Sequence, residues 1–178
     1  MGSVVHLAAD GAHRFSKTAR NTVKLIAGIG IAGDAHAGTT VQHLSRVRSN
    51  PDAPNLRQVH LLHAELLDDL RQAGFNVEPG DLGENLTTRD VPLLGLSRGT
   101  RLQVGRTVEL EITGLRNPCA QIEAFQSGLL KAVLGLDEDG SLIRKTGVMA
   151  IVVNGGAIAI GDMIAVIAPA RFVPLEPV

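Results

Sequence analysis

The segment Thr107-Val108-Glu109-Leu110-Glu111-Ile112-Thr113 alternates apolar and polar side chains and leads into Arg116-Asn117-Pro118-Cys119. Such alternation is typical of a β-strand with one buried face. Other short segments of this kind recur along the chain, without the regular exchange of strands and helices that indicates a parallel α/β sheet. The sequence therefore predicts a mainly β fold, a β-barrel with a few helical insertions.

The expected strands are separated by turns rich in glycine, proline and asparagine. They span residues 3–9, 23–27, 58–62, 100–104, 107–113, 148–153, 157–160 and 163–168. Asn154-Gly155-Gly156 suits the positive φ angles of a tight turn, so residues 148–160 are expected to form a β-hairpin. One amphipathic helix is expected over residues 63–73. The polar segment 13–21 and the long segment 39–56 are expected to be loops, the first pointing outward.

Length and composition limit the class of protein. The 178 residues suit a single domain, 1–178, with a core over about 25–168 and a tail at 169–178. A hydrophobic fraction of 44% and a charged fraction of 20% are typical of a globular protein. A net charge of -1 attracts neither nucleic acid nor an anionic membrane, and four Phe without Trp or Tyr offer little for base stacking. Neither partner is expected.

The sequence also lacks targeting signals and paired cysteines. Met1–His6 has no charged region followed by a long apolar core, as a signal peptide would, and no apolar run is long enough to cross a membrane. The single cysteine excludes an internal disulfide and a cysteine-rich zinc site. We therefore expect a cytoplasmic protein.

Cys119 stands where local chemistry favours a reactive thiol. Asn117 is a favoured helix N-cap and Pro118 a favoured first residue, which places Cys119 in the first turn of a helix. The free amide groups and the dipole of that turn stabilise a thiolate, and Arg116 adds positive charge. A lone cysteine is also often a small buried apolar side chain. The local sequence leaves both roles open.

Two glycine-bounded segments carry further candidate residues. Asp34 and His36 are two positions apart, so both side chains point the same way if the segment is extended. Gly80-Asp81-Leu82-Gly83-Glu84-Asn85 brings together two carboxylates, an amide and accessible backbone N–H groups. Each segment also suits an ordinary turn whose side chains bond only nearby backbone.

Basic residues and a glycine motif complete the candidates. Arginines and lysines that converge would hold a phosphate or another small anion, although each alone is typical of a solvated surface. The scattered basic residues are Arg46, Arg48, Arg57, Arg116, Arg144 and Lys145. Gly28, Gly30 and Gly33 match a dinucleotide-binding fingerprint, but residues 34–38 break the helix that must follow. We therefore reject a Rossmann site.

In their order along the chain, these segments resemble the MOSC domain, a family named after the C-terminal domain of molybdenum cofactor sulfurase. The matching segments are Gly33-Asp34-Ala35-His36-Ala37-Gly38, Asn55-Leu56-Arg57-Gln58-Val59, Gly80-Asp81-Leu82-Gly83-Glu84-Asn85-Leu86-Thr87, Arg116-Asn117-Pro118-Cys119, and Gly155-Gly156 with Gly161-Asp162. They span about residues 25–168. The specific part of the pattern is the Gly-Glu-Asn-Leu-Thr block followed by Arg-x-Pro-Cys.

The resemblance implies a MOSC-type β-barrel with a cleft that holds one cysteine. In such proteins the cysteine binds the molybdenum of the molybdopterin cofactor or carries sulfur, and Cys119 matches it. Asp34 and His36 are implied to act beside Cys119 in catalysis. The residues expected to bind the cofactor are Arg57, Glu84, Asn85, Thr87, Arg116 and Lys145, of which the basic ones are chosen by charge as phosphate donors.

The implied function is molybdenum-dependent reduction of an N-hydroxylated small molecule. The electrons would come from a separate donor protein, and a cofactor-delivery protein is another implied partner. One alternative is a carrier that holds sulfur as a Cys119 persulfide, or binds the cofactor, without turnover. Another is a barrel with a degenerate cleft that only mediates interactions. No pyridoxal-binding lysine motif is present, so pyridoxal phosphate is not expected.

Overall fold

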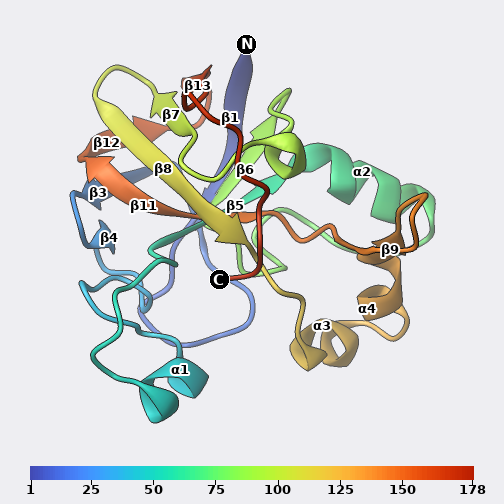
Figure 1. Ribbon diagram of the computed structural model, residues 1–178. Coiled ribbons are helices and arrows are strands. Elements are labelled where there is room, and N and C mark those ends of the chain that lie inside the picture. Colours follow the sequence, from blue (N-terminus) through green and yellow to red (C-terminus); the bar gives the residue numbers. More distant parts are fainter.

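The computed structural model describes residues 1–178 and shows a closed β-barrel with short helices around it (Figure 1). The barrel strands are Gly2–Ala8 (β1), Val59–His63 (β5), Leu86–Arg89 (β6), Arg101–Val104 (β7), Val108–Leu115 (β8), Val148–Asn154 (β11) and Met163–Ile167 (β13). They are ordered β13-β7-β8-β11-β5-β6-β1, and pairing of β1 with β13 closes the ring of seven strands. Only β5 and β6 pair in parallel. The predicted mainly β barrel with helical insertions is confirmed.

The remaining elements lie outside this ring. The short strands are Ala19–Arg20 (β2), Thr22–Ile26 (β3), Gly30–Ile31 (β4), Leu134–Leu136 (β9), Leu142–Arg144 (β10) and Gly156–Ala159 (β12). The helices are Leu44–Ser49 (α1), Ala64–Gln72 (α2), Ala120–Phe125 (α3), Leu129–Ala132 (α4) and the 3-10 turn Leu93–Gly95 (η1). β2 extends the barrel sheet beside β1, β12-β3-β4 forms a three-stranded sheet, and β9 pairs with β10. None of the helices has the length and apolar character needed to span a lipid bilayer.

The barrel interior holds the main hydrophobic core, a cluster of 22 buried residues. β8 shows why the strand forms: Val108, Leu110 and Ile112 are buried, whereas the glutamates between them lie on the outer face. Those glutamates pair with Arg101 on the neighbouring strand β7, 2.5 Å from Glu109 and 2.7 Å from Glu111. The alternation read from the sequence thus matches the two faces of the barrel wall.

A second core of nine buried residues lies beside the barrel and fixes the helices. The leucines of α2 supply one side of it, as their helical spacing predicts, and Ile122 of α3 and Leu129 of α4 supply another. Because α3 has only six residues, this packing holds it in place rather than its own helix propensity. The residue that begins α3 is therefore positioned by a hydrophobic contact.

The predicted hairpin over residues 148–160 is wrong. β11 pairs with β5 and β8, whereas β12 leaves the barrel and pairs with β3. Gly155, in the connection, lies so close to β3 that an added Cβ would be 2.7 Å from the carbonyl oxygen of Leu25. The glycines read as a hairpin turn instead allow a close crossing between two sheets.

The segment at residues 13–21 is exposed at both ends, as predicted, but its middle turns inward. The side chain of Lys17 is only 3% exposed, and Phe15 packs against the second core. Residues after Pro169 also contact the barrel: the N–H of Leu115 donates to Glu176 O at 2.8 Å, and Val178 N donates to Leu115 O at 3.2 Å. Both segments carry polar residues whose partners lie far along the chain, so local composition gave no sign of their packing.

Gly147 offers a test of how tightly β5 and β11 approach. Its φ is +81°, and an added Cβ would lie 2.0 Å from Leu61 O, whereas Gly140 has nearly the same φ, +80°, with nothing within 4 Å. We expect Gly140→Ala to lower the free energy of unfolding by about 1 kcal/mol from backbone strain alone. Gly147→Ala should cost about 3 kcal/mol or more. Urea denaturation measures both, and equal losses would contradict the close approach.

Candidate functional site

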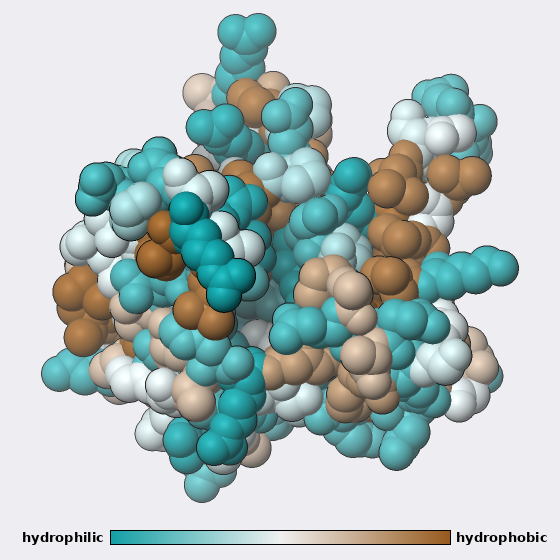
Figure 2. Space-filling view, turned by 90° about the horizontal axis from the view of Figure 1, so that it is seen from below, coloured by the Kyte–Doolittle hydropathy of each residue, from teal (hydrophilic) through white to brown (hydrophobic).

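A cleft of about 490 Å³ opens at one end of the barrel, between α1 and α3. Both helices lie on the underside in Figure 1, and Figure 2 shows a hollow on that face bordered mainly by hydrophilic side chains. The residues that line it are His13, Arg14, Phe15, Lys17, His36, His43, Leu44, Ser45, Arg48, Arg57, His60, Gly83, Asn85, Arg116, Cys119, Ala120, Gln121 and Met149. Segments distant in sequence thus meet in one pocket, and most of the residues that line it are polar or charged.

Cys119 lies in this cleft as a free, half-buried thiol. It is the N-cap of α3, with extended φ and ψ of −127° and 168°, so the prediction that it occupies the first helical turn is wrong. Asn117 does not cap the helix because its Oδ1 accepts a hydrogen bond from Arg144 Nε at 2.9 Å. The thiol of Cys119 lies 3.6 Å from Gln121 Oε1. Its exposure to the cleft excludes the role of buried core residue.

Two arginines beside Cys119 carry hydrogen-bond donors without partners. Arg116 is only 7% exposed, and its Nη1 is buried without a hydrogen bond. Arg57 donates from Nη1 to Val178 O at 3.0 Å, but its Nε is likewise buried and unpaired. Buried cations with free N–H groups favour an anion as their partner.

Burial lowers the pKa of both arginines. Together with the positive charges of Arg46 and Arg116, it lowers the pKa of Arg57 to about 10. A negative charge on Cys119 has the opposite effect and raises the pKa of each arginine. Even so, both guanidinium groups remain charged at neutral pH. The cleft therefore offers positive charge next to its single sulfur.

Three histidines form a cluster at the mouth of the cleft. The ring of His36 lies 5.3 Å, centroid to centroid, from His13 on one side and from His43 on the other. Burial, followed by the charges of Arg57 and other nearby cations, lowers the pKa of His43 to about 4. His43 is therefore neutral at neutral pH, and the arginines supply most of the positive charge of this wall.

Asp34 and Lys17 form a buried ion pair behind the histidines. Asp34 Oδ2 lies 2.5 Å from Lys17 Nζ, and its side chain is fully shielded from solvent. Asp34 Oδ1 accepts the backbone N–H of His36 at 2.9 Å and lies 3.3 Å from His36 Nδ1, which is equally close to Lys17 Nζ. Asn85 Nδ2 donates to Asp34 Oδ2 at 3.0 Å. Every oxygen of this carboxylate is bonded, so it fixes His36.

The pKa of Asp34 reflects opposing effects. Burial disfavours the charged form, but the hydrogen bond to His36 and the charge and hydrogen bond of Lys17 outweigh it and hold the pKa well below its usual range. Burial lowers the pKa of Lys17, and the attraction of Asp34 opposes this. Each charge is tolerated inside the protein because the other is present.

Glu84 and Thr87 lie beneath the cleft floor. Glu84 Oε1 accepts from Gly80 N at 2.7 Å and from the Thr87 hydroxyl at 3.0 Å, while Oε2 is buried without a partner. Burial raises the pKa of Glu84, partly offset by these hydrogen bonds. Above them, the ring of His60 contacts Thr146 O through Nε2 at 2.7 Å. These residues support the floor and do not line it, His60 excepted.

The structure brings most of the predicted site residues together. His36, Arg57, Asn85, Arg116 and Cys119 line the cleft. Asp34, Glu84 and Thr87 lie directly behind its wall, bonded to residues around it. Lys145 does not line the cleft, and its side chain lies against Gly135 of β9 instead. Their functional roles remain predictions.

Sequence reasoning missed several residues of the wall. Lys17 lies in a polar segment with no motif, and its ion-pair partner is 17 positions away. His13 comes from a loop, and Met149 from β11. Nothing in the local pattern of these residues indicates convergence, because the barrel closure brings them together. The one usable signal was the position of His43 in the long loop over residues 39–56, because long loops often carry functional residues.

The buried pair predicts a specific pH dependence. Asp34→Asn should lower the free energy of unfolding by about 3–5 kcal/mol at pH 7, because Lys17 is left buried without its partner. In the double variant with Lys17→Met, the loss should be smaller than the sum of the single losses. Urea denaturation at several pH values measures these differences.

The direction in which stability changes with pH follows from the lowered pKa of Asp34, whose ordinary value is 3.8. The stability from the ionised carboxylate is present above that unfolded-state value and is lost as the pH falls toward the folded-state pKa. The difference between wild type and Asp34→Asn should therefore stay constant from pH 7 to about 5 and shrink only in stronger acid. Shrinkage between pH 7 and 5, or additive losses, would contradict the ion pair.

Known proteins share this arrangement of strands. The family model described as the MOSC domain matches residues 34–165. The crystal structure of YuaD protein from Bacillus subtilis is 25% identical, with a TM-score of 0.75, over 93% of this chain and 96% of that one. YiiM from Geobacillus stearothermophilus shares the fold at 16% identity and a TM-score of 0.65, over 94% of this chain and 75% of that one. No curated protein sequence matches.

YiiM from Escherichia coli has the same fold at 18% identity and a TM-score of 0.62, over 97% of this chain and 73% of that one. The family match extends over most of the chain and includes the cleft-lining residues from His36 to Met149. This chain belongs to the MOSC domain family.

Proposed function

We propose that this protein binds the molybdenum cofactor in the cleft through Cys119 and reduces N-hydroxylated small molecules, with electrons from a separate donor protein. The observation that carries the proposal is the half-buried thiol of Cys119 beside the buried, unpartnered Nη1 of Arg116. A thiolate is a soft metal ligand, and arginine is a preferred donor to phosphate. A metal-bearing cofactor with a phosphate group needs both.

The other cleft residues fit the same cofactor. Arg57 has a second unpaired donor that would bind the phosphate, and the polar side chains of Asn85 and His36 line the cleft, where they would hydrogen-bond the pterin. No group of three or more His, Cys, Asp or Glu side chains is arranged to hold a metal. Cys119 would thus be the protein's ligand to molybdenum, and the cofactor would bring the others.

When bound, the cofactor supplies two-electron redox chemistry. Reducing an N–OH group to N–H breaks the N–O bond, consumes two electrons and two protons, and releases water. His36 is our candidate for supplying a proton from Nε2 at this step, since its Nδ1 is held between Lys17 Nζ and Asp34 Oδ1, 3.3 Å from each, and the proton of a neutral ring then sits on Nε2 when Lys17 donates to Nδ1. General acid catalysis of this kind requires a proton donor held at a fixed position in the cleft.

The charge of the cleft limits its substrates. Arg14 and Arg48 line it together with Arg57 and Arg116, whereas no Asp or Glu side chain does. A cationic substrate would be repelled by this field, and a neutral or anionic one would be attracted. We therefore expect neutral or anionic N-hydroxylated compounds to be reduced faster than cationic ones of the same size.

Cofactor content tests the proposal. After expression in a host that makes the cofactor, the wild-type protein should contain molybdenum and pterin, and Cys119→Ala should lose most of the metal. Arg116→Met should lower pterin content by about tenfold or more, because a charge-assisted hydrogen bond is removed. Arg98→Met, outside the cleft, removes the same charge and should leave both unchanged. Elemental analysis and pterin fluorescence measure these contents.

A molybdenum-free wild-type protein, or a Cys119→Ala variant with full metal content, would overturn the ligand role of Cys119. A sulfur carrier is the second candidate, because Cys119 is both free and accessible from the cleft. Mass spectrometry of the intact chain separates the two functions. One added sulfur atom on Cys119, in protein without reductase activity, would support the carrier.

A further inference from the structure

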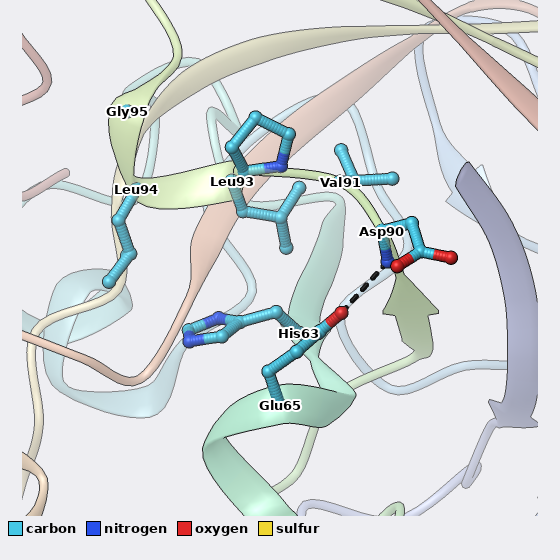
Figure 3. Close-up of a pocket in the computed structure, with 8 residues that line it drawn as sticks. His63, Glu65, Asp90, Val91, Leu93, Leu94 and Gly95 are labelled. Atoms are coloured by element: carbon cyan, nitrogen blue, oxygen red, sulfur yellow. Dashed lines mark hydrogen bonds between the residues drawn. The ribbon is translucent and has the colours of Figure 1, made fainter. Parts of the chain in front are cut away.

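A second cavity, of about 410 Å³, lies at the other ends of two barrel strands that reach the cleft. β5 carries His60 toward the cleft and ends at His63, and β6 runs parallel to it from just after Asn85 to Arg89. The chain leaves β5 into α2 and leaves β6 into η1, so the two connections diverge. The space between them is the second cavity (Figure 3).

One wall of this cavity has unsatisfied hydrogen-bonding atoms. His63 Nδ1 and Glu65 Oε2 are both buried without a partner. The other carboxylate oxygen of Glu65 accepts the backbone N–H of Asp90 at 2.8 Å, which holds the side chain in place (Figure 3). A group with N–H or O–H donors placed against this wall would satisfy the free oxygen.

The rest of the cavity is apolar and without positive charge. Val91, Pro92, Leu93 and Leu94 form the wall contributed by the β6–η1 connection, and no Lys or Arg lines the cavity. Burial lowers the pKa of His63, so its ring is neutral at neutral pH. The carboxylate of Asp90 is exposed and, in Figure 3, points away from His63. Arg89, whose charge reaches Glu65, does not line the cavity and pairs with Asp68 at 2.9 Å, so the charge that a ligand meets inside is that of Glu65.

We propose that this cavity is a second binding site, separate from the cleft, for a small organic amine with an apolar body. The cationic amino group pairs with Glu65 and the apolar body packs against Leu93 and Leu94. This preference is opposite to that of the arginine-lined cleft, so one compound class does not suit both places. The site requires neither Cys119 nor a bound cofactor.

Benzylamine is the probe for this site, and benzyl alcohol and benzoate are its neutral and anionic counterparts. In amide NMR spectra of the full chain at neutral pH, benzylamine should shift the signals of Asp90 and Leu94 with roughly millimolar affinity, as expected for so small a ligand. Benzyl alcohol should bind at least about fivefold more weakly because it lacks the charge. Benzoate should not bind.

Two matched variants identify the carboxylate responsible. Glu65→Gln keeps an oxygen for the Asp90 N–H and removes the charge, so benzylamine affinity should fall about tenfold. Asp90→Asn removes the same charge at the exposed position and suits the φ of +59° found there, so affinity should change less than about twofold. The proposal would be overturned if benzylamine caused no shifts at a concentration roughly 20-fold above the expected millimolar dissociation constant. Equal losses in both variants, or shifts confined to the Cys119 cleft, would also overturn it.

Discussion

Asn85 makes the hydrogen bonds on which the cleft depends. Its side-chain Oδ1 accepts from His60 N at 3.1 Å, and Nδ2 donates to Ala8 O at 3.2 Å and to Asp34 Oδ2 at 3.0 Å. Its backbone N–H donates to His60 O and its carbonyl accepts from Ala8 N, each at 2.8 Å. One buried residue thus connects β1, β5 and the loop of Asp34. A side chain without both amide functions would leave at least one of these buried groups unpaired.

The cleft has two electrically different halves. On the side of Asp34 and Lys17 the buried charges neutralise each other, and the carboxylate is fully bonded. On the side of Arg57 and Arg116 no acidic side chain lines the cleft, and the charge of Glu84 beneath the floor acts on Arg116 without a hydrogen bond between them. The first half makes the cleft rigid. The second half has unpaired N–H groups that can bind an anion. This division explains why the same pocket can be both pre-formed and selective.

The sequence predicts those parts of the structure that depend on interactions between residues close together along the chain. The strand over residues 107–113 and the helix over 63–73 were predicted because burial of alternate or helically spaced residues is visible locally. The pairing of β12 with β3 was not, because glycines permit a close crossing as readily as a turn. The start of α3 was also misplaced, since Asn117 bonds Arg144 instead of capping the helix. Cap residues predict a helix start only when no distant partner competes.

For the site, motif residues such as Asp34, Asn85 and Cys119 were found because they stand among glycines or beside a proline. Lys17 could not be found, because its position inside the protein depends on a carboxylate that only the folded chain brings near. Lys145 shows the converse limit: charge alone suggested a cleft residue, but its side chain lies against β9. Charge identifies candidates, and long-range topology decides which of them meet.

The pairing of β1 with β13 has a consequence for how the chain reaches this state during translation. Gly2, near the start of the chain, is opposite Ile164 in the closing pair of the ring. While the ribosome is still making the chain before residue 163, β1 and β7 each expose an unpaired edge to other nascent or misfolded chains. Closure must be the last folding event of the barrel, and its long sequence separation makes it slow. Until β13 emerges, the ring therefore keeps two open edges at which it can pair with another chain.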